Sequence, residues 1–330
     1  TRDGVSLGYN LYFRETDYGE FNVANYLTNS NGFGAQFGYP ISDITRLGFN
    51  ITYDKTDIDV GSLPAREIYD FVSAEGNIFE TLSAQLSWQR VTLNRGLFPT
   101  DGASTVLSFS STIPGSDLSY YRLNVRQRYY QPLTQNLVFG FQGELGYLNA
   151  YGDTEETPFF QNFYAGGPRS LRGFESNTLG PRSTDAPCYE FNYAEGTCPN
   201  LLDIDGDGEL DTPYYNPYAN QTSRYRDAPI GGNIKIEGSL QLIFKLPFIE
   251  DQRSLRSAFF FDFGNVFSDN CKEYQINCSE PSIDDLRYSY GVGITWITGF
   301  GPMSLAIAKP TNAGPRERTE EFQFTVGNVF

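Results

Sequence analysis

The feature that most constrains this 330-residue chain is an alternation of apolar and polar side chains with period two, which recurs along most of its length. In the stretch YYRLNVRQRYY, Tyr121 and Leu123 lie on one face of an extended segment, whereas Arg122 and Arg126 lie on the other. Turns rich in Gly, Pro, Asn and Asp separate such segments, and no helical period of useful length is evident. We predict about twelve strands on this basis, near residues 5–14, 32–40, 44–53, 81–93, 103–113, 120–132, 137–150, 233–246, 255–267, 286–297, 302–309 and 321–330.

The charges on the polar face indicate where water lies. An antiparallel sheet of this length is expected to close, because open edges invite aggregation. Its polar face carries Arg122, Arg126, Glu144, Glu237 and Asp262, which is too much charge for a dry interior. The opposite face is aromatic and aliphatic, as contact with lipid requires. The pattern therefore predicts an all-β fold, a transmembrane antiparallel β-barrel with a wet lumen; a large secreted β-sandwich is the alternative.

Composition excludes several other classes of protein. A mean hydropathy of −0.40 is compatible with a membrane barrel, because lipid-facing and lumen-facing residues average to a polar value. The formal net charge of −16 argues against nucleic acid as a partner. No apolar run of about 18 residues predicts a transmembrane helix. Since the chain has no His and no nucleotide-binding fingerprint, we predict that it is not an enzyme and has no resident cofactor.

Two segments interrupt the strand pattern. Residues 54–80 are expected to form a mixed loop with one possible short turn. Residues 151–232 form a connection far beyond ordinary loop lengths, which is typical of a functional or disordered segment. Within it, GGPRSLRGFESNTLGPR places Arg172 in an apolar setting, where a guanidinium should find a carboxylate with bidentate geometry. In FFFDFGNVF, the flanking aromatic residues take the lipid face and turn Asp262 into the lumen; a solvated turn arginine is the alternative.

An acidic cluster in the same long segment has two interpretations. The sequence DIDGDGELDT spaces Asp203, Asp205 and Asp207 like the first ligands of an EF-hand loop, and Asp211 follows them. The twelfth position, normally a bidentate Glu, is Tyr214, and no flanking helices are evident. A calcium-ordered external loop and an acidic, solvated loop tip therefore both stay open.

Four motifs follow one another in an order typical of one known family. They are NRGLFPTDGA at 94–103, TIPGSD at 112–117, FYAGGPRSLRGFESNTLGPR at 163–182 and FFFDFGNVF at 259–267. Over essentially its whole length the chain resembles the BamA/TamA superfamily of outer-membrane proteins. Its final strand, EFQFTVGNVF, is similar to the C-terminal assembly signal of bacterial outer-membrane barrels, through Phe322, Phe324, Val326, Gly327 and Phe330.

The resemblance implies a sixteen-stranded barrel preceded by periplasmic POTRA domains. The stretch DGVSLGYNLYF is similar to the fifth strand of the family's barrel. We therefore expect residues 1–330 to form a transmembrane barrel domain whose loop at 151–232 enters the lumen, without the POTRA domains and the first four strands. No signal peptide is visible, so the chain is expected to be mature or excised from a longer one.

The resemblance also implies a partner for the loop arginine. In the family, the arginine of the RGF motif folds back into the barrel and meets the aspartate of an FDxG strand, which corresponds to Asp262. Many members carry a carboxylate where Gln241 stands, so Glu237, on the same face of the same strand, could substitute for it. The expected latch comprises Arg172, Gly173, Phe174, Asp262, Glu237 and Gln241.

Four cysteines occur as two local pairs, Cys188 with Cys198 and Cys271 with Cys278. They lack CxxC spacing and the chain has no His, so two loop disulfides in an oxidising compartment are favoured over zinc. Members of the family often carry a disulfide in the loop that holds the first pair. Both closures are short, and each is expected to contribute about 2–3 kcal/mol.

The function implied by the resemblance is outer-membrane protein assembly, in which client barrels fold and insert non-covalently at a seam between the first and last strands. The implied partners are client outer-membrane proteins, the lipoproteins of the assembly complex through the POTRA domains, the lipid bilayer and lipopolysaccharide. The implied location is the bacterial outer membrane. A passive channel or porin, and a transporter of the two-partner-secretion type, are the alternatives. The RGF loop and Asp262 favour assembly, since a plug is the opposite of an open pore.

Overall fold

The computed structural model describes residues 4–21, 23–24, 26–60, 65–184, 228–246, 254–273, 275, 278–299 and 301–327. Twelve strands form a single sheet in which neighbours pair antiparallel, and the prediction of an all-β fold is confirmed. In order across the sheet, the strands are β1 (Ser6–Asp17), β2 (Tyr26–Ser42), β3 (Thr45–Val60), β4 (Ile78–Val91), β5 (Gly102–Thr112), β6 (Tyr120–Thr134), β7 (Leu137–Ala150), β9 (Ile234–Phe244), β10 (Leu255–Phe267), β11 (Arg287–Thr298), β12 (Gly301–Pro310) and β14 (Phe322–Val326).

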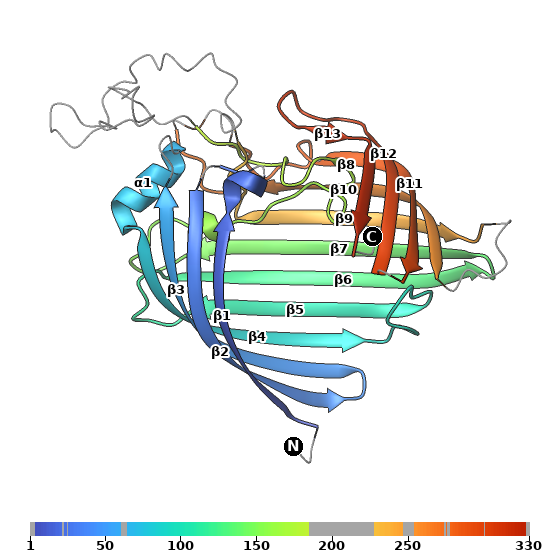
Figure 1. Cartoon of the computed structure of the whole chain (residues 1–330), viewed down its shortest axis with the longest axis horizontal. Helices are drawn as coiled ribbons and strands as arrows, with labels where there is room; N and C mark the ends of the chain where they lie inside the picture. The colour runs from blue at the N-terminus through green and yellow to red at the C-terminus, as the bar shows by residue number, and fades with distance from the viewer. Residues whose placement is uncertain are drawn as a thin grey trace.

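The remaining elements lie in the connections. A two-stranded sheet pairs β8 (Gly173–Phe174) with β13 (Thr319–Glu320), and the helical elements are η1 (Tyr18–Phe21), α1 (Arg66–Glu75) and η2 (Phe159–Gln161). The large sheet curls, so that its first and last strands run steeply relative to the central strands (Figure 1). The described residues of the connection between β7 and β9, 151–184 and 228–233, lie near α1 and β13 at one end of this curl (Figure 1).

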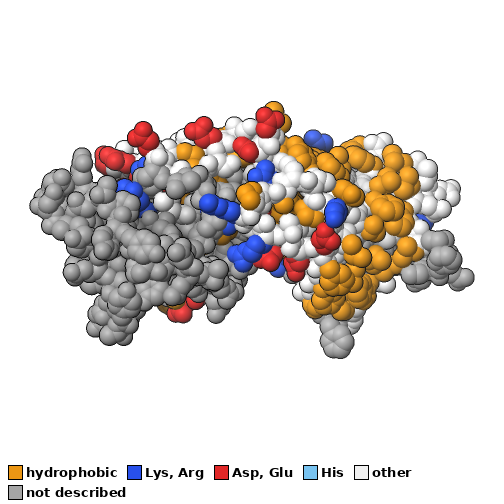
Figure 2. Space-filling model, turned by 90° about the horizontal axis from the view of Figure 1, so that it is seen from above, with side chains coloured by type: hydrophobic (Ala, Val, Ile, Leu, Met, Phe, Trp, Pro, Cys, Tyr) orange, Lys and Arg blue, Asp and Glu red, His pale blue; other side chains and the backbone are white. Residues whose placement is uncertain are grey.

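The two faces of the sheet differ as the alternation predicts. On β10, Phe259 and Phe261 are exposed while Asp262 is fully buried, because successive side chains point to opposite faces. Hydrophobic side chains gather in a broad band over part of the visible surface, and most visible charged side chains lie outside it (Figure 2). Within the described part of the chain, no helix has the length and apolar character needed to cross a membrane.

The dry core lies between the concave face of the sheet and the β7–β9 connection. Leu171, Phe174 and Leu179 of that connection cluster with Leu148 of β7 and Val266 of β10, and all five are fully buried. A second cluster joins α1 and the ends of β2 to β4 to the same connection. Since the core forms between one sheet and a loop, the described residues do not have the two packed sheets of a sandwich.

The expectation of a mixed loop over residues 54–80, without a helix of useful length, is wrong. Strand β3 continues to Val60, because Ile58 pairs opposite Thr28 of β2 and is buried. Helix α1 then buries Ile68 and Phe71, which lie three residues apart on one face, against the core. Charged residues on both faces of β3 hid the strand, and a helix of ten residues is too short for a clear period.

Two adjacent positions on β5 test which face contacts lipid. Phe109 is exposed on the outer face, whereas Ser108 lines a polar cavity on the concave side. We expect Phe109→Arg to lower the free energy of unfolding by about 2–4 kcal/mol in vesicles, because the guanidinium enters the bilayer. The matched control Ser108→Arg should cost less than about 1 kcal/mol, since its charge meets water. Urea unfolding followed by heat-modifiable gel migration measures both, and equal losses would contradict the assignment of the faces.

Candidate functional site

The site is built around the described parts of the β7–β9 connection, residues 151–184 and 228–233, which we call the plug. Its backbone doubles back on itself through antiparallel bridges between Ala165 and Leu179 and between Phe163 and Gly232. The hydroxyl of Tyr164 donates to the carbonyl of Ile230 at 3.3 Å, and burial raises the pKa of this phenol above its ordinary value. These contacts fold the plug into a compact hairpin-like segment.

The plug delivers Arg172 to Asp262 on the concave face of β10. The Nε and Nη2 groups of Arg172 each donate to one carboxylate oxygen of Asp262 at 2.7 Å. The backbone N–H of Arg172 also donates to Oδ2 of Asp262 at 3.2 Å. Arg172 is 4% exposed and Asp262 is 0% exposed, so the pair is bidentate and buried.

Two further residues surround the guanidinium. Nη2 of Arg172 donates to the hydroxyl of Ser239 on β9 at 2.9 Å, and the guanidinium carbon lies 3.5 Å from the ring centroid of Phe260. The ring face therefore adds a cation–π contact on a desolvated charge. The sequence analysis did not identify either residue, although both lie on the inward face of the sheet with residues that it did identify. Ser239 lies between Glu237 and Gln241 on β9, and Phe260 lies two positions before Asp262 on β10.

The two residues after Arg172 in the RGF motif fit the plug to the last strands. Gly173 has a φ of +89°, and a Cβ there would lie 3.2 Å from the Cβ of Ala308, so only glycine fits without strain. Phe174 is fully buried in the plug core. Both residues form β8, which pairs with Thr319 and Glu320 of β13.

Glu237 and Gln241 have different partners from those expected. Glu237 accepts a hydrogen bond from the hydroxyl of Ser170 and forms an ion pair with Lys235 at 3.0 Å, so it holds the preceding turn of the plug. Gln241 accepts from Nη2 of Arg256 at 3.1 Å through its Oε1. The second side chain bonded to Arg172 is therefore Ser239, because it lies directly opposite Asp262 in the β9–β10 register.

The remaining sequence-predicted residues divide into described and undescribed positions. Cys271 and Cys278 form a disulfide in the β10–β11 connection. Phe322, Phe324 and Val326 are exposed on the outer face of β14, and Gly327 follows with a φ of +83°. The positions outside the described residues are Cys188, Cys198, Asp203, Asp205, Asp207, Asp211 and Phe330.

A curled antiparallel sheet with an apolar exterior, and a plug held inside by a buried arginine–aspartate pair, define the class of membrane β-barrels that carry a lumen loop. The family model described as the Omp85 superfamily domain matches residues 1–330. The chain therefore belongs to the Omp85 superfamily.

Two relatives illustrate the range of this similarity. The chain is 28% identical to the outer membrane protein assembly factor BamA of Neisseria meningitidis, over 100% of this chain and 40% of that protein. It is 22% identical to the sorting and assembly machinery component 50 homolog of Mus musculus, over 84% of this chain and 50% of that protein. The chain thus spans about 40% to half of the length of these curated relatives.

Solved structures agree with the family assignment. BamA from Haemophilus ducreyi lacking POTRA domains 1–3 superimposes with a TM-score of 0.78 at 26% identity, over 99% of this chain and 59% of that one. CdiB from Escherichia coli gives a TM-score of 0.53 at 10% identity, over 97% of this chain and 48% of that one, and shows likeness of fold alone. The twelve strands are accordingly part of the wall of a BamA-type barrel.

The buried pair predicts a large and specific loss of stability. We expect Arg172→Ala to lower the free energy of unfolding by about 3–5 kcal/mol, because the charge of Asp262 is left buried without a partner. Arg126→Ala is the control, since Arg126 pairs with Glu144 at 3.1 Å but is largely exposed, and its loss should stay below about 1 kcal/mol. Urea unfolding of the barrel measures both. If the double swap Arg172→Asp with Asp262→Arg regains none of the stability lost in Arg172→Asp, the two charges do not act as a direct pair.

Proposed function

We propose that the chain is the barrel part of an outer-membrane protein assembly factor, located in the bacterial outer membrane, which helps client β-barrels to fold and insert. The observation that carries this proposal is the 28% identity to BamA along the whole chain. The similarity to BamA from Haemophilus ducreyi, at a TM-score of 0.78, supports it independently of that alignment.

The pairing of the last strand supports the proposed mechanism. Among the described residues, β14 pairs with β12 over five residue pairs, whereas β11 and β12 pair over ten. Because each ladder pair adds backbone hydrogen bonds, the described part of β14 is held to β12 by a shorter ladder than the one that holds β11 to β12. An exposed strand edge is a template for another chain, and a client strand could add to it by β-augmentation. This chemistry breaks no covalent bond, and the proposal includes neither an enzymatic step nor a resident cofactor.

The finer partner assignments are also part of the proposal. Client outer-membrane proteins would meet the last strand, while the lipid bilayer and lipopolysaccharide would contact the apolar exterior. Lipoproteins of an assembly complex would bind mostly through POTRA domains, as the resemblance implies. Calcium at the acidic segment that contains Asp203 and Asp207 stays a prediction, because this segment lies outside the described residues.

A passive channel is the second candidate, and one observation favours it. A polar cavity of about 520 Å³ lies on the concave side of β1 to β6, lined largely by hydroxyl groups together with Arg14, Asp54 and Arg122. Such a lining suits water and ions. The plug weighs against free conduction, because Arg172 and Asp262 fix it to the wall on the concave side.

Folding of a client in vesicles separates the two candidates. We expect vesicles that carry this chain to accelerate the folding of a small outer-membrane barrel from urea, relative to empty vesicles, because the edge of the last strand offers a template for client strands. Heat-modifiable migration of the client on a mild gel measures its rate of folding. Vesicles that carry the heat-denatured chain are the control. Steady ion conductance with no acceleration of the client would contradict the assembly proposal and favour the channel.

A further inference from the structure

The chain leading into the last strand is divided between the plug and the wall. Residues Phe322–Val326 pair with β12, but Thr319 and Glu320 leave the wall and pair with Phe174 and Gly173 of the plug. The crossing point is Glu321, whose carbonyl accepts from the N–H of Ala308 on β12 at 2.8 Å. The segment Thr319–Val326 therefore contributes to two sheets, and the placement of Thr319 and Glu320 depends on the position of the plug.

Gln323 bridges these two sheets through its side chain. Its Nε2 donates to the carbonyl of Phe174 at 2.8 Å, and its Oε1 accepts from the N–H of Gly173 at 3.3 Å. A primary amide offers one face with a donor and an acceptor, as a peptide group does. The side chain of Gln323, a residue that is 1% exposed, thus forms the same two hydrogen bonds between the wall and β8 as a peptide group of a paired strand would.

The same three plug residues are therefore held from two sides. Arg172 binds Asp262 on β10, while Gly173 and Phe174 bind Gln323 on β14. Strands β11 and β12 lie between these two anchors in the sheet. Gly173 and Phe174 are buried, so loss of the Gln323 amide would take one hydrogen bond from the carbonyl of Phe174 and one from the N–H of Gly173 at a place closed to water, although Gly173 also pairs with Glu320 in the β8–β13 ladder.

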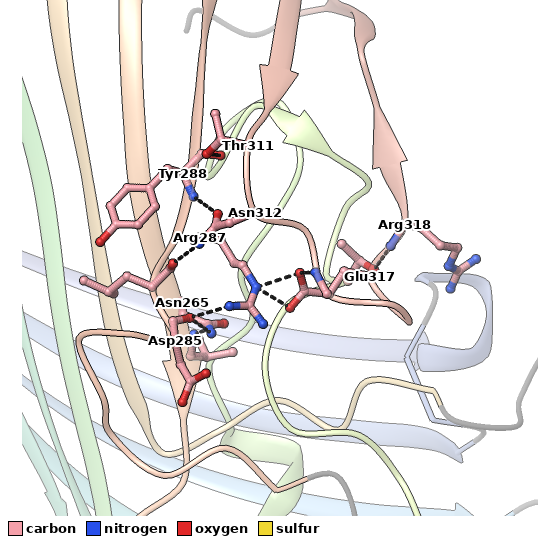
Figure 3. A network of polar contacts seen from close by, with 12 residues as sticks. Asn265, Asp285, Arg287, Tyr288, Thr311, Asn312, Glu317 and Arg318 are labelled. Atoms are coloured by element: carbon pink, nitrogen blue, oxygen red, sulfur yellow. Dashed lines mark hydrogen bonds and ion pairs between the residues drawn. The ribbon is translucent and has the colours of Figure 1, made fainter.

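The loop before β13 strengthens this connection at its outer end. Glu317 accepts from Nε of Arg287 at 2.7 Å with both carboxylate oxygens, and Arg287 also donates to the carbonyl of Asp285 at 3.1 Å (Figure 3). Next to this pair, the N–H of Arg318 donates to the hydroxyl of Thr178 in the plug at 2.9 Å. The loop is thus fixed to β11 on one side and to the plug on the other (Figure 3).

We propose that Gln323 is a positioning residue that couples the plug to the last strand, so that release of the plug and loosening of Thr319–Val326 are one event. The Arg172–Asp262 pair on β10 then influences the position of the last strand, β14, although β11 and β12 lie between them in the sheet. A role for this coupling in client assembly rests on the proposed function. The coupling itself is a property of the fold and can be measured without a client.

Hydrogen exchange of the folded chain, read by mass spectrometry, tests the coupling. In Gln323→Met, which keeps the side-chain volume, we expect exchange at residues 171–175 of the plug to accelerate about tenfold or more, because the carbonyl of Phe174 and the N–H of Gly173 each lose one buried hydrogen bond. In Asp262→Asn, exchange should accelerate by a similar factor at residues 171–175 and at 319–326. In the double variant, Gln323→Met should add less than it does alone, since the shared segment is already released.

Two further variants keep the test decisive. Ser304→Ala removes a buried hydrogen bond to Thr295 at 2.9 Å inside the wall beside β14, and exchange at residues 171–175 should stay as in the unaltered chain. If Gln323→Met does not fold, Thr178→Val removes the acceptor of the Arg318 N–H, together with one acceptor of Arg182 inside the plug, and should accelerate both segments together by a smaller factor. The proposal is overturned if Asp262→Asn opens the plug while residues 319–326 keep their native protection, or if Gln323→Met leaves the plug unchanged.

Discussion

The charge of an arginine that is 4% exposed has to be neutralised where it lies, because burial of a lone charge costs more than a domain can offset from its marginal stability. Arg172 meets this requirement with both oxygens of Asp262, the hydroxyl of Ser239 and the ring face of Phe260. The N–H donors of the planar Arg172 guanidinium have fixed directions, so the acceptors must lie in one orientation around it. The path of the plug through the barrel, and the glycine at position 173, follow from bringing this one side chain to this one point.

The buried pair also explains why a barrel with a charged lumen has a dry core. The wall alone exposes apolar side chains outward and polar side chains inward, so it buries little apolar surface by itself. Leu171, the residue before Arg172, packs together with Phe174 and Leu179 against Leu148 and Val266. Burial of these side chains and neutralisation of the charge support each other, because the apolar cluster excludes water that would weaken the ion pair.

Features of the fold and the site could be predicted where the sequence pattern that specifies them is local, and not where they depend on residues far apart in the chain. Period-two alternation is local, so it identified the strands and turned Asp262 inward, and the RGF motif identified the residues of the plug that matter. The sequence analysis did not predict the end of β3, residues 54–60, or helix α1, because their burial comes from contacts with distant residues, such as that of Phe71 with Phe159. The link from Gln323 to the plug has no local signal: the N–H of Gly173 and the carbonyl of Phe174 lie about 150 residues away and are backbone atoms, which every sequence has.

The division of the last strand between wall and plug gives the seam a physical basis. Among the described residues, Phe322–Val326 pair with β12, while Thr319 and Glu320 pair with β8 of the plug. The side chain of Gln323 also binds β8, and the plug is itself anchored at Asp262. A strand held in this way has two discrete arrangements available, bound to the plug or free of it, rather than a continuous range. The anchor at Asp262 can influence the distant edge of the last strand only through an equilibrium that both of them shift. The equilibrium between the bound and the free arrangement of this strand is such an equilibrium.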